Sequence, residues 1–300
     1  MDTQLLTAFT IAAENHSFSK TAELLGISQS AVSKRIALLE KSVGSLLFDR
    51  ISRRIVLTEA GKSLLPRAKQ IIQSIEDAQQ FMFDRGGEVS GQLRIATSHH
   101  IGIHRLPESL SRFTTQYPDV HLQLHFLDSE QAIEAILHGD YDLALITLSD
   151  DILEERNEWI QSHTLWEDPM YFVSNDEHPL SQHKQLQLSE LATYPAILPD
   201  ATTQTTQLVK RLFTDANKEL DVAMNTNHLD AIKMMISVGL GWSVLPQTLI
   251  KDHLHRLPVV NGDDSPALTR YLGCIYHRER TLSNAARAMV NLLRNSSKAS

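Results

Sequence analysis

The pattern of apolar residues changes at residues 85–91, and this change limits the architecture of the whole chain. Before it, residues 59–84 predict one long helix with the 4, 3, 4, 3, 4 spacing of a coiled-coil seam. The seam positions are Leu64, Ala68, Ile71, Ile75, Ala78 and Met82. After it, strand-like and helix-like segments alternate to the end of the chain. Gly86, Gly87 and Gly91 make the boundary a linker, so we expect separate N-terminal and C-terminal parts.

Ahead of the long helix, residues 18–41 predict two helices joined by a tight turn. Ser19 is expected to cap the first helix, which ends at Gly26, and Ser28 to cap the second. Apolar residues on the second helix form a single stripe, and its opposite face carries hydroxyls, an amide and cations. Such a face suits base edges and phosphates in a DNA major groove. The candidate DNA-binding residues are Gln29, Ser30, Ser33, Lys34 and Arg35, and the alternative is a surface hairpin with a solvated face.

A short β-prone segment, residues 55–57, follows this hairpin after a group of three arginines. Arg50, Arg53 and Arg54 lie within five residues of one another. We interpret the segment as a β-wing whose arginines touch phosphates or enter a minor groove. An ordinary charged hairpin tip is the alternative.

Charge is distributed unevenly along the chain. The net charge of the 300 residues is -8, which argues against a protein that coats nucleic acid generally. Residues 1–70, however, hold 10 Lys or Arg against 6 Asp or Glu, while the remainder holds 18 against 30. The first part therefore has a net charge of +4 and the rest -12. This asymmetry indicates that only the N-terminal part meets a polyanion such as double-stranded promoter DNA.

The order of residues from 22 to 65 resembles the winged helix-turn-helix of LysR-type transcriptional regulators. The matching residues are Ala22, Leu25, Ser28, Gln29, Ser30, Ala31, Val32, Ser33, Ile36, Leu39, Glu40, Gly44, Leu47, Phe48, Arg50, Leu57, Thr58, Gly61 and Leu65. The resemblance is dense over the first quarter of the chain and architectural over the rest. It implies a homodimer through the long helix, assembly to a homotetramer, and a two-lobed effector-binding half that looks like a periplasmic binding protein. RNA polymerase is a further candidate partner of such a regulator.

Beyond the linker, alternating βα units predict an open, largely parallel sheet. The expected strands are 93–97, 120–127, 142–148, 170–174, 196–198, 222–227, 242–245 and 268–277, and the expected helices are 103–117, 130–137, 188–194, 204–216, 229–238 and 284–294. Crossings near residues 160 and 267 divide the elements into two α/β lobes that share a cleft. The fold class is thus multi-domain: an N-terminal all-α winged helix-turn-helix with a long linker helix, then a two-lobed α/β effector domain. The expected boundaries are 1–60, 61–90 and 91–300, with lobe I at 91–160 and 268–300 and lobe II at 161–267.

Several predicted strands end in polar residues just before a helix, where ligands of open α/β sheets bind. The candidate effector-binding residues are Thr97, Ser98, His99, His100, Thr147, Thr202, Thr203 and Asn227. Their hydroxyls, imidazoles and nearby backbone N–H groups suit a small anionic co-inducer. The alternative for any one of them is ordinary capping of the following helix. Convergence of four such strand ends on one cleft favours the ligand site.

Other functional classes find less support in the sequence. A metal sensor would draw on the 14 histidines, among them His99, His100 and His104, but no His-Glu-x-x-His or Cys/His spacing is present. An enzyme would use Ser98 with a neighbouring histidine, yet no nucleophile-elbow motif occurs. We therefore expect no catalysis, no metal and no cofactor.

The remaining alternative is a ligand-binding receptor module without DNA binding. The N-terminal wing argues against it, as does Asp2, which spoils an export signal. Cys274, the single cysteine, excludes a disulfide framework. With no apolar transmembrane stretch, these features predict a cytoplasmic protein with no membrane partner.

Overall fold

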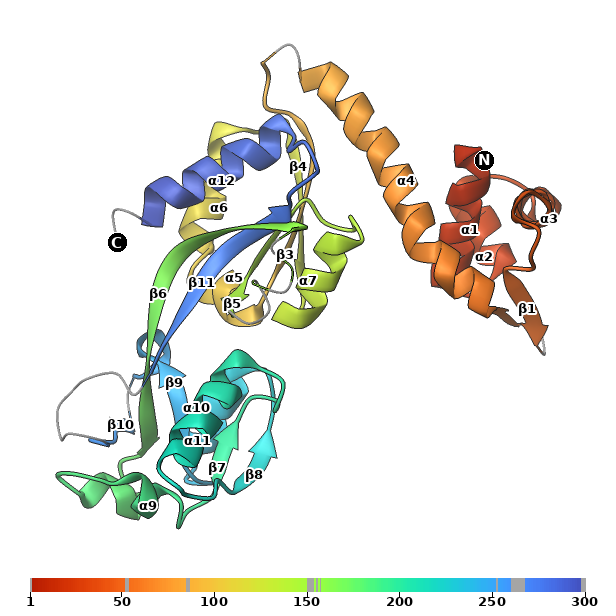
Figure 1. Ribbon diagram of the computed structural model, residues 1–300. Helices are drawn as coiled ribbons and strands as arrows, with labels where there is room; N and C mark the ends of the chain where they lie inside the picture. The colour runs from red at the N-terminus through yellow and green to blue at the C-terminus, as the bar shows by residue number, and fades with distance from the viewer. Residues whose placement is uncertain are drawn as a thin grey trace.

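The computed structural model describes residues 2–51, 54–84, 87–149, 154, 156, 158–251, 253–259 and 268–297. Figure 1 shows a helical head at the N-terminus, a long helix α4 (Glu59–Asp84), and two α/β lobes beyond it. Among the described residues, no helix is long and apolar enough to span a membrane.

The head consists of three helices and a two-stranded hairpin. Its elements are α1 (Thr3–Asn15), α2 (Phe18–Leu25), α3 (Gln29–Val43), β1 (Phe48–Ile51) and β2 (Arg54–Leu57). Ser28 caps α3 as expected, accepting a hydrogen bond from the Ala31 N–H at 3.2 Å. The cap of α2 is Ser17 rather than Ser19, because α2 begins at Phe18. The wing strands also mean that the head is not all-α.

The head has its own hydrophobic core, which explains the positions of its helices. Val32, Ile36 and Leu39, the predicted stripe of α3, are almost completely buried. They pack with α1 and with Phe48 of the wing. Gly61 at the start of α4 lies so close to the wing that a Cβ there would clash with the Leu47 carbonyl oxygen. Only glycine allows α4 to approach the wing in this way.

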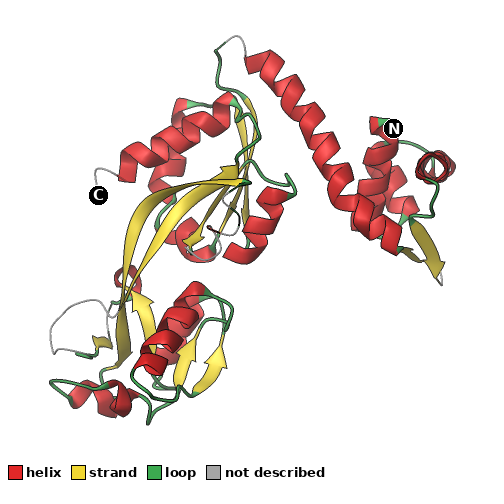
Figure 2. Cartoon of the chain, viewed as in Figure 1, coloured by secondary structure: helices red, strands yellow, loops and turns green. Residues whose placement is uncertain are grey.

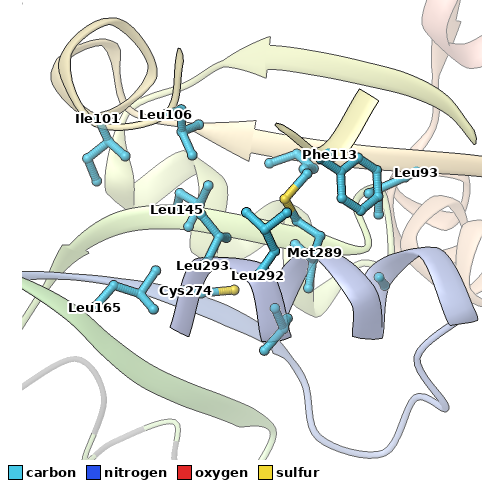
Figure 3. Close-up of a cluster of buried hydrophobic side chains, with 14 of the residues drawn as sticks. Leu93, Ile101, Leu106, Phe113, Leu145, Leu165, Cys274, Met289, Leu292 and Leu293 are labelled. Carbon is cyan, nitrogen blue, oxygen red and sulfur yellow. The ribbon is translucent and has the colours of Figure 1, made fainter. Parts of the chain in front are cut away.

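Lobe I is a sheet with helices on both faces (Figure 2). Its elements are β3 (Gly91–Thr97), α5 (His99–His104), α6 (Pro107–Gln116), β4 (Val120–Phe126), α7 (Ser129–Leu137), β5 (Leu143–Leu148) and α12 (Asn284–Ser297), with parts of β6 (Ile160–Asn175) and β11 (Leu268–His277). Figure 3 shows the core beneath α12, where Leu93, Leu145 and Met289 are fully buried. Alternate residues of the same strands, such as Ala144, face a second core against α7.

Lobe II contains a smaller parallel pair of strands and the far ends of β6 and β11. Its elements are η1 (Pro179–Gln182), α9 (Leu188–Leu191), β7 (Ala196–Leu198), α10 (Gln204–Asp215), β8 (Val222–Asn225), α11 (Leu229–Ser237), β9 (Ser243–Pro246), η2 (Gln247–Leu249) and β10 (Leu254–Arg256). Trp242 is the largest fully buried side chain, and its indole N–H donates to the Leu191 carbonyl at 2.9 Å. This hydrogen bond fixes the short helix α9 to the lobe's core.

The main sheet is mixed, and the expectation of a largely parallel sheet was wrong. The strand order is β10-β6-β11-β5-β3-β4, with β9 also paired to β6. Strands β3, β4 and β5 are parallel, but β11 runs antiparallel to both β5 and β6. The two long strands return the chain between lobes without a helical crossover, which the alternating pattern did not reveal.

Two element boundaries also differ from the sequence expectation. The single helix expected at 103–117 is two helices, because Pro107 begins α6 and has no N–H to continue α5. The crossover expected near residue 160 and the strand at 170–174 are one continuous strand, β6. Leu165 and Trp166 still belong to the core of lobe I, while Met170 belongs to that of lobe II. The chain therefore changes lobe between Trp166 and Met170.

Candidate functional sites

The polar face of α3 is open to solvent. Gln29, Ser30 and Lys34 are exposed, and Ser33 is half-buried. Arg35 is held against the head, since its Nη2 donates to the Gln4 Oε1 of α1 at 3.0 Å. The exposed residues thus share one face, as the sequence predicted, while Arg35 has an intramolecular partner.

The wing follows α3 in the chain and forms an antiparallel hairpin. Arg50 pairs with Ile55 and Ile51 with Arg54 in the register of β1 and β2. Glu40 at the end of α3 ties the two motifs together, because its Oε1 accepts from the Leu47 N–H at 2.8 Å. Arg53 lies outside the described residues, as do the side chains of Arg50 and Arg54.

The seam of α4 divides into two parts. Leu64 and Ala68 pack onto the core of the head. Ile71 and Ile75 remain 37% and 36% exposed, and Ala78 is exposed as well. The Met82 side chain lies outside the described residues. Only the second part of the seam is therefore available to another molecule in this arrangement.

The middle of α4 also contacts lobe I. The Lys69 ammonium lies 3.0 Å from Glu14 of α1 and 3.2 Å from Asp140 after α7. Next to it, the Arg94 guanidinium of β3 donates to the Gln73 amide oxygen at 2.5 Å. Head, linker helix and lobe I are thus joined by polar contacts.

A cavity of about 70 Å³ lies between the lobes, where the sequence placed the ligand site. Seven of the eight predicted residues line it: Ser98, His99, His100, Thr147, Thr202, Thr203 and Asn227. They come from strand ends, loops and the start of α5, and they belong to both lobes. Thr97 does not line the cavity, because its side chain is completely buried and its hydroxyl donates to the Ser98 carbonyl. This volume is well below the roughly 300–1,000 Å³ of drug-sized pockets.

Capping explains only some of these residues. Thr203 does cap α10, accepting from the Thr206 N–H at 3.4 Å. Ser98 and Asp128 stand at cap positions of α5 and α7 without making a side-chain capping bond. The hydroxyl of Ser98 and the carboxylate of Asp128 are thus not used for capping.

Side chains of the two lobes meet around the cavity. The Asn227 amide of lobe II donates to the Asp128 carboxylate of lobe I at 2.9 Å, and its oxygen accepts from the Asp200 N–H. The His104 ring lies 3.4 Å from the Asp230 carboxylate. These contacts join the two lobes across the cleft.

A buried charged cluster forms the floor of the cavity at the point where β6 and β11 cross between lobes. Asp168 of β6 and Arg270 of β11 are direct neighbours in the antiparallel register. The Asp168 carboxylate accepts from the Arg270 Nε and from the Arg105 Nη2, each at 2.8 Å. Arg270 lines the cavity, and its Nη1 donates to the Thr205 hydroxyl of lobe II at 3.0 Å. The cluster therefore joins residues from the crossing strands and from both lobes.

Several buried nitrogens of this cluster have no hydrogen-bond partner among the described residues. They are the Nη2 of Arg270, the Nε of Arg105 and both ring nitrogens of His100. The His100 Nε2 lies 3.6 Å from the Asp168 Oδ2, which is too long for a good hydrogen bond. Burial lowers the pKa of His100, and Arg270 lowers it further against the opposing effect of Asp168. His100 is therefore neutral near pH 7.

The electrostatics of the floor leave one excess positive charge. Burial alone would raise the pKa of Asp168, but the guanidinium groups of Arg270 and Arg105 lower it far below its usual range. Asp168 thus carries one negative charge against two permanently charged guanidinium groups. The wall of the cavity is acidic by contrast, since Asp128 and Glu130 line it. Burial raises the pKa of Glu130, and Asp128 and Asp200 raise it further.

Sequence reasoning missed Arg270, Asp168 and Arg105. Asp168 and Arg270 lie inside strands and Arg105 follows a helix, whereas the predicted site residues are polar residues at strand ends. One signal was available: Arg270 lies within the mostly apolar strand Leu268–His277, and an ion inside a buried strand needs a partner.

No metal or redox site is evident among the described residues. No group of three or more His, Cys, Asp or Glu there could hold a metal ion. Burial raises the pKa of Cys274 to about 12, so its thiol stays protonated and unreactive.

Two family models match the chain, each over one part of it. Residues 3–62 match the model described as bacterial regulatory helix-turn-helix protein, lysR family. Residues 86–298 match the model described as LysR substrate binding domain. Together the matches cover the head and the two lobes.

Similar proteins extend over almost the whole chain. The HTH-type transcriptional regulator YeiE of Escherichia coli is 31% identical over 291 residues, covering 95% of this chain and 94% of YeiE. The HTH-type transcriptional activator CmpR of Synechocystis is 29% identical over 287 residues, covering 95% of this chain and 92% of CmpR.

Solved structures share the fold at lower sequence identity. A full-length single-residue variant of OxyR from Pseudomonas aeruginosa has a TM-score of 0.74 at 17% identity, covering 98% of each chain. Full-length CbnR complexed with its target DNA has a TM-score of 0.68 at 21% identity, covering 99% of this chain and 100% of CbnR. The regulatory domain of Synechocystis CcmR in complex with 2-PG has a TM-score of 0.61 at 21% identity, covering 70% of this chain and 98% of that one.

Proposed function

The chain belongs to the LysR family of bacterial helix-turn-helix transcriptional regulators, and on this premise we propose how its parts work together. The head, residues 1–60, reads promoter DNA. The linker helix and hinge, residues 61–90, join two copies. Residues 91–300 bind a small anionic effector between lobes I and II and regulate the head. The observation that carries the proposal is the cavity between the lobes, which polar residues of both lobes and the Arg270 side chain line.

The DNA-reading surface is the exposed face of α3 together with the wing. Gln29, Ser30 and Ser33 suit base edges, whereas Lys34 suits a phosphate. On the sequence alone, we assign the arginines of the wing and its tip to contacts with the DNA backbone or with a minor groove: Arg50, Arg53 and Arg54. Arg35 either contributes to this surface once its hydrogen bond to Gln4 is broken, or keeps that bond and fixes the orientation of α3 against α1. The net positive charge of the first 70 residues supports this assignment.

Dimerisation follows from the exposed half of the α4 seam. Ile71, Ile75 and Ala78 keep the 4, 3 spacing of a coiled coil and are exposed in the single chain. Paired heads would then present two α3 helices to half-sites about one helical turn apart, or a multiple of it. A tetramer would present two such pairs, and RNA polymerase would meet the assembly at the promoter.

The effector acts through the cleft. Ser98, His99, His100, Thr147, Thr202, Thr203 and Asn227 are proposed to surround it, with Thr97 supporting Ser98 from the core. A ligand that contacts both lobes favours the closed cleft, and the difference in affinity between open and closed states sets the size of the response. Movement of lobe I reaches the head through Lys69 and Gln73 of α4. The chain itself performs no catalytic step, and it acts in the cytoplasm.

The proposal is tested by measuring affinity for the promoter beside its own gene at several salt concentrations. For the full-length protein, the logarithm of the binding constant should fall linearly with the logarithm of salt concentration. Arg50→Ala should weaken binding to all sequences and reduce the slope by about 1. Gln29→Ala should instead reduce discrimination among sites. DNA affinity that does not depend on salt would refute the proposal.

A further inference from the structure

The contact between α4 and lobe I lies on the side of the helix opposite the exposed seam. Three polar residues of α4 make this contact: Lys69, Gln70 and Gln73. Each residue of an α-helix turns the chain by about 100°, so these three positions lie nearly half a turn away from the exposed seam positions. One helix can therefore carry the dimer seam and the contact with lobe I at the same time.

No shared hydrophobic core joins α4 to lobe I. Among the described residues, the apolar side chains of α4, such as Ala68 and Ile72, pack on the core of the head, and the clusters of lobe I contain no residue of α4. Two cavities, of about 390 Å³ and about 620 Å³, lie between α4 and lobe I, and Gln73 and Gly139 border both. Domains of one chain can move relative to each other unless their interface is large and hydrophobic. This interface is therefore of the kind that can separate, with α4 remaining on the head.

A single lysine links the head to lobe I across this interface. The Lys69 ammonium lies 3.0 Å from the Glu14 carboxylate of the head and 3.2 Å from the Asp140 carboxylate of lobe I. Burial lowers the pKa of Lys69, but Glu14 and Asp140 together raise it above its ordinary value, so the bridge is charged at neutral pH. The three side chains are 26%, 54% and 33% exposed, so dissolved ions reach them and weaken the attraction.

The other contacts of α4 with lobe I carry no net charge. The Gln73 amide oxygen accepts from the Arg94 guanidinium, whose charge is already balanced by Asp142 of lobe I. The Gln70 amide donates to the Leu137 carbonyl at 3.3 Å. These hydrogen bonds set the position of α4 on lobe I, and the charges of the lysine bridge supply the long-range attraction.

The chain can bend between α4 and lobe I at Gly87. This residue is exposed and has a φ of 77°, a conformation that glycine adopts without strain. The next residue is already attached to lobe I, because the Glu88 carbonyl accepts from the Asn284 amide of α12 at 3.0 Å. A pivot at Gly87 would thus leave α4 with the head and Glu88 with lobe I.

We propose that α4 and lobe I form a reversible ionic latch: Lys69 holds the head against lobe I, and its release lets the head turn about Gly87. The proposal rests on the proposed route from lobe I to the head and adds a second state to it. In the latched state, a shift of lobe I passes to the head through Asp140, Lys69 and Glu14. In the released state the head and lobe I move independently. Because ion pairs hold the latch, salt shifts the equilibrium toward release.

The paired substitutions Gln73→Cys and Gly139→Cys allow a disulfide that reports the latched state in the full-length protein. A Cβ at Gly139 would lie 3.6 Å from the Gln73 Cβ, within the roughly 3.5–4.5 Å that a disulfide spans. Cys274 is fully buried with its pKa raised to about 12, so it does not compete. Non-reducing gels measure the rate of intrachain disulfide formation in a glutathione buffer. Both cysteines are present throughout, so the cost of the two substitutions is the same in every comparison.

The latch predicts how this rate responds to salt and to charge. Between about 50 and about 500 mM NaCl the rate should fall about 5-fold, because salt screens the partly exposed ion pairs. At low salt, Lys69→Glu should lower the rate about 10-fold or more, since Glu14 and Asp140 then repel residue 69. Adding Asp140→Lys should restore the rate to within about 3-fold. Each rate is divided by the rate at which iodoacetamide alkylates the same variant, which removes effects on thiol reactivity.

Lys62→Glu is the matched control, because it reverses a charge on the same helix away from lobe I. Lys62 pairs with Glu59 of α4 itself at 2.7 Å, so this substitution should leave the rate of disulfide formation unchanged. If Lys69→Glu does not fold, as judged by circular dichroism, the salt series on the parent protein still decides.

Three results would overturn the latch. A rate that does not change with salt, or that is unchanged in folded Lys69→Glu, would mean that the ion pairs do not hold the contact. Absence of an intrachain disulfide at low salt would mean that lobe I does not rest on α4. None of these results bears on the salt-dependent affinity for promoter DNA, which tests separately whether the chain reads DNA as proposed.

Discussion

Asp168→Asn tests whether the charged cluster at the lobe crossing holds the effector half together. The carboxylate is completely buried and accepts hydrogen bonds from Arg105 and Arg270 at 2.8 Å. Asparagine has nearly the same shape but carries no charge, and its amide nitrogen is a donor facing donors. The substitution therefore leaves two guanidinium groups without a counter-charge.

The expected loss of unfolding free energy depends on how far each arginine can be rehydrated in the variant. Arg105 is 21% exposed and can be partly rehydrated, but Arg270 at 6% cannot. Removing one partner of a buried ion pair costs about 3–5 kcal/mol. We expect a loss in this range in the free energy of unfolding of the effector half.

Asp142→Asn is the matched control, because Asp142 also contacts two arginines. It lies 3.1 Å from Arg94 and 3.1 Å from Arg280, but its side chain is 14% exposed and those of the arginines are 21% and 18% exposed. All three groups can regain solvation, so this substitution should cost only about 1–2 kcal/mol.

Denaturant unfolding of the full chain, followed by tryptophan fluorescence, measures both variants. All three tryptophans, Trp159, Trp166 and Trp242, lie in the α/β half, so the signal reports that half alone. Equal losses of unfolding free energy for the two variants, or a loss below about 1 kcal/mol for Asp168→Asn, would contradict this role of the buried cluster.

The difference between wild type and Asp168→Asn should also depend on pH in a defined direction. Because the pKa of Asp168 is lowered on folding, its contribution is fully present above the ordinary value of 3.8 and is lost as the pH falls below it. The difference in unfolding free energy between wild type and Asp168→Asn should be constant from about pH 7 to about 5 and should become smaller in acid.

Three further predictions concern other parts of the molecule. Ile75→Glu, at a seam position that is 36% exposed, should dissociate the dimer, as measured by analytical ultracentrifugation. Ser74→Glu, one residue off the seam, should leave the dimer intact. A dimer that is unaffected by Ile75→Glu would show that α4 is not the interface. His100→Gln should reduce the loss of folding stability between about pH 7 and 5.5, because burial lowers the pKa of His100 and protonation then favours the unfolded chain. Burial also lowers the pKa values of His163, His178 and His277, and these histidines account for the pH dependence that remains. An unchanged pH dependence of stability would contradict the role given to His100. Gly61→Ala should destabilise the head by about 1–3 kcal/mol in far-UV circular dichroism melts, since its Cβ would clash with the Leu47 carbonyl oxygen; no change would mean that α4 and the wing separate freely.

The sequence predicted the parts of the fold that depend on local chemistry. The bounds of α4 were predicted correctly, and Ser28, Gly26 and the apolar stripe of α3 have the predicted places, because caps and periodicity act over a few residues. The errors arose where distant residues decide. The antiparallel β11, which closes the sheet between β5 and β6, depends on pairing with strands far away in the chain.

The same distinction applies to the candidate site. Seven polar residues at strand ends could be named, since the carboxyl ends of parallel strands meet at one edge. Arg270 could not, because its importance depends on Asp168 opposite it, Thr205 beside it and a cavity in front of it. Such a cluster becomes visible only when strands far apart in sequence are placed together.

Closure of the cleft is proposed to change how the two heads engage DNA. Asp128 and Asn227 touch across the cleft, so Asp128→Cys with Asn227→Cys allows a short, reducible bifunctional thiol reagent to lock it shut. Cys274, fully buried with its pKa raised to about 12, does not compete. DNase footprints on the promoter should differ in length or in hypersensitive sites between the locked and the reduced protein. Identical footprints from fully cross-linked and reduced protein would contradict the claim.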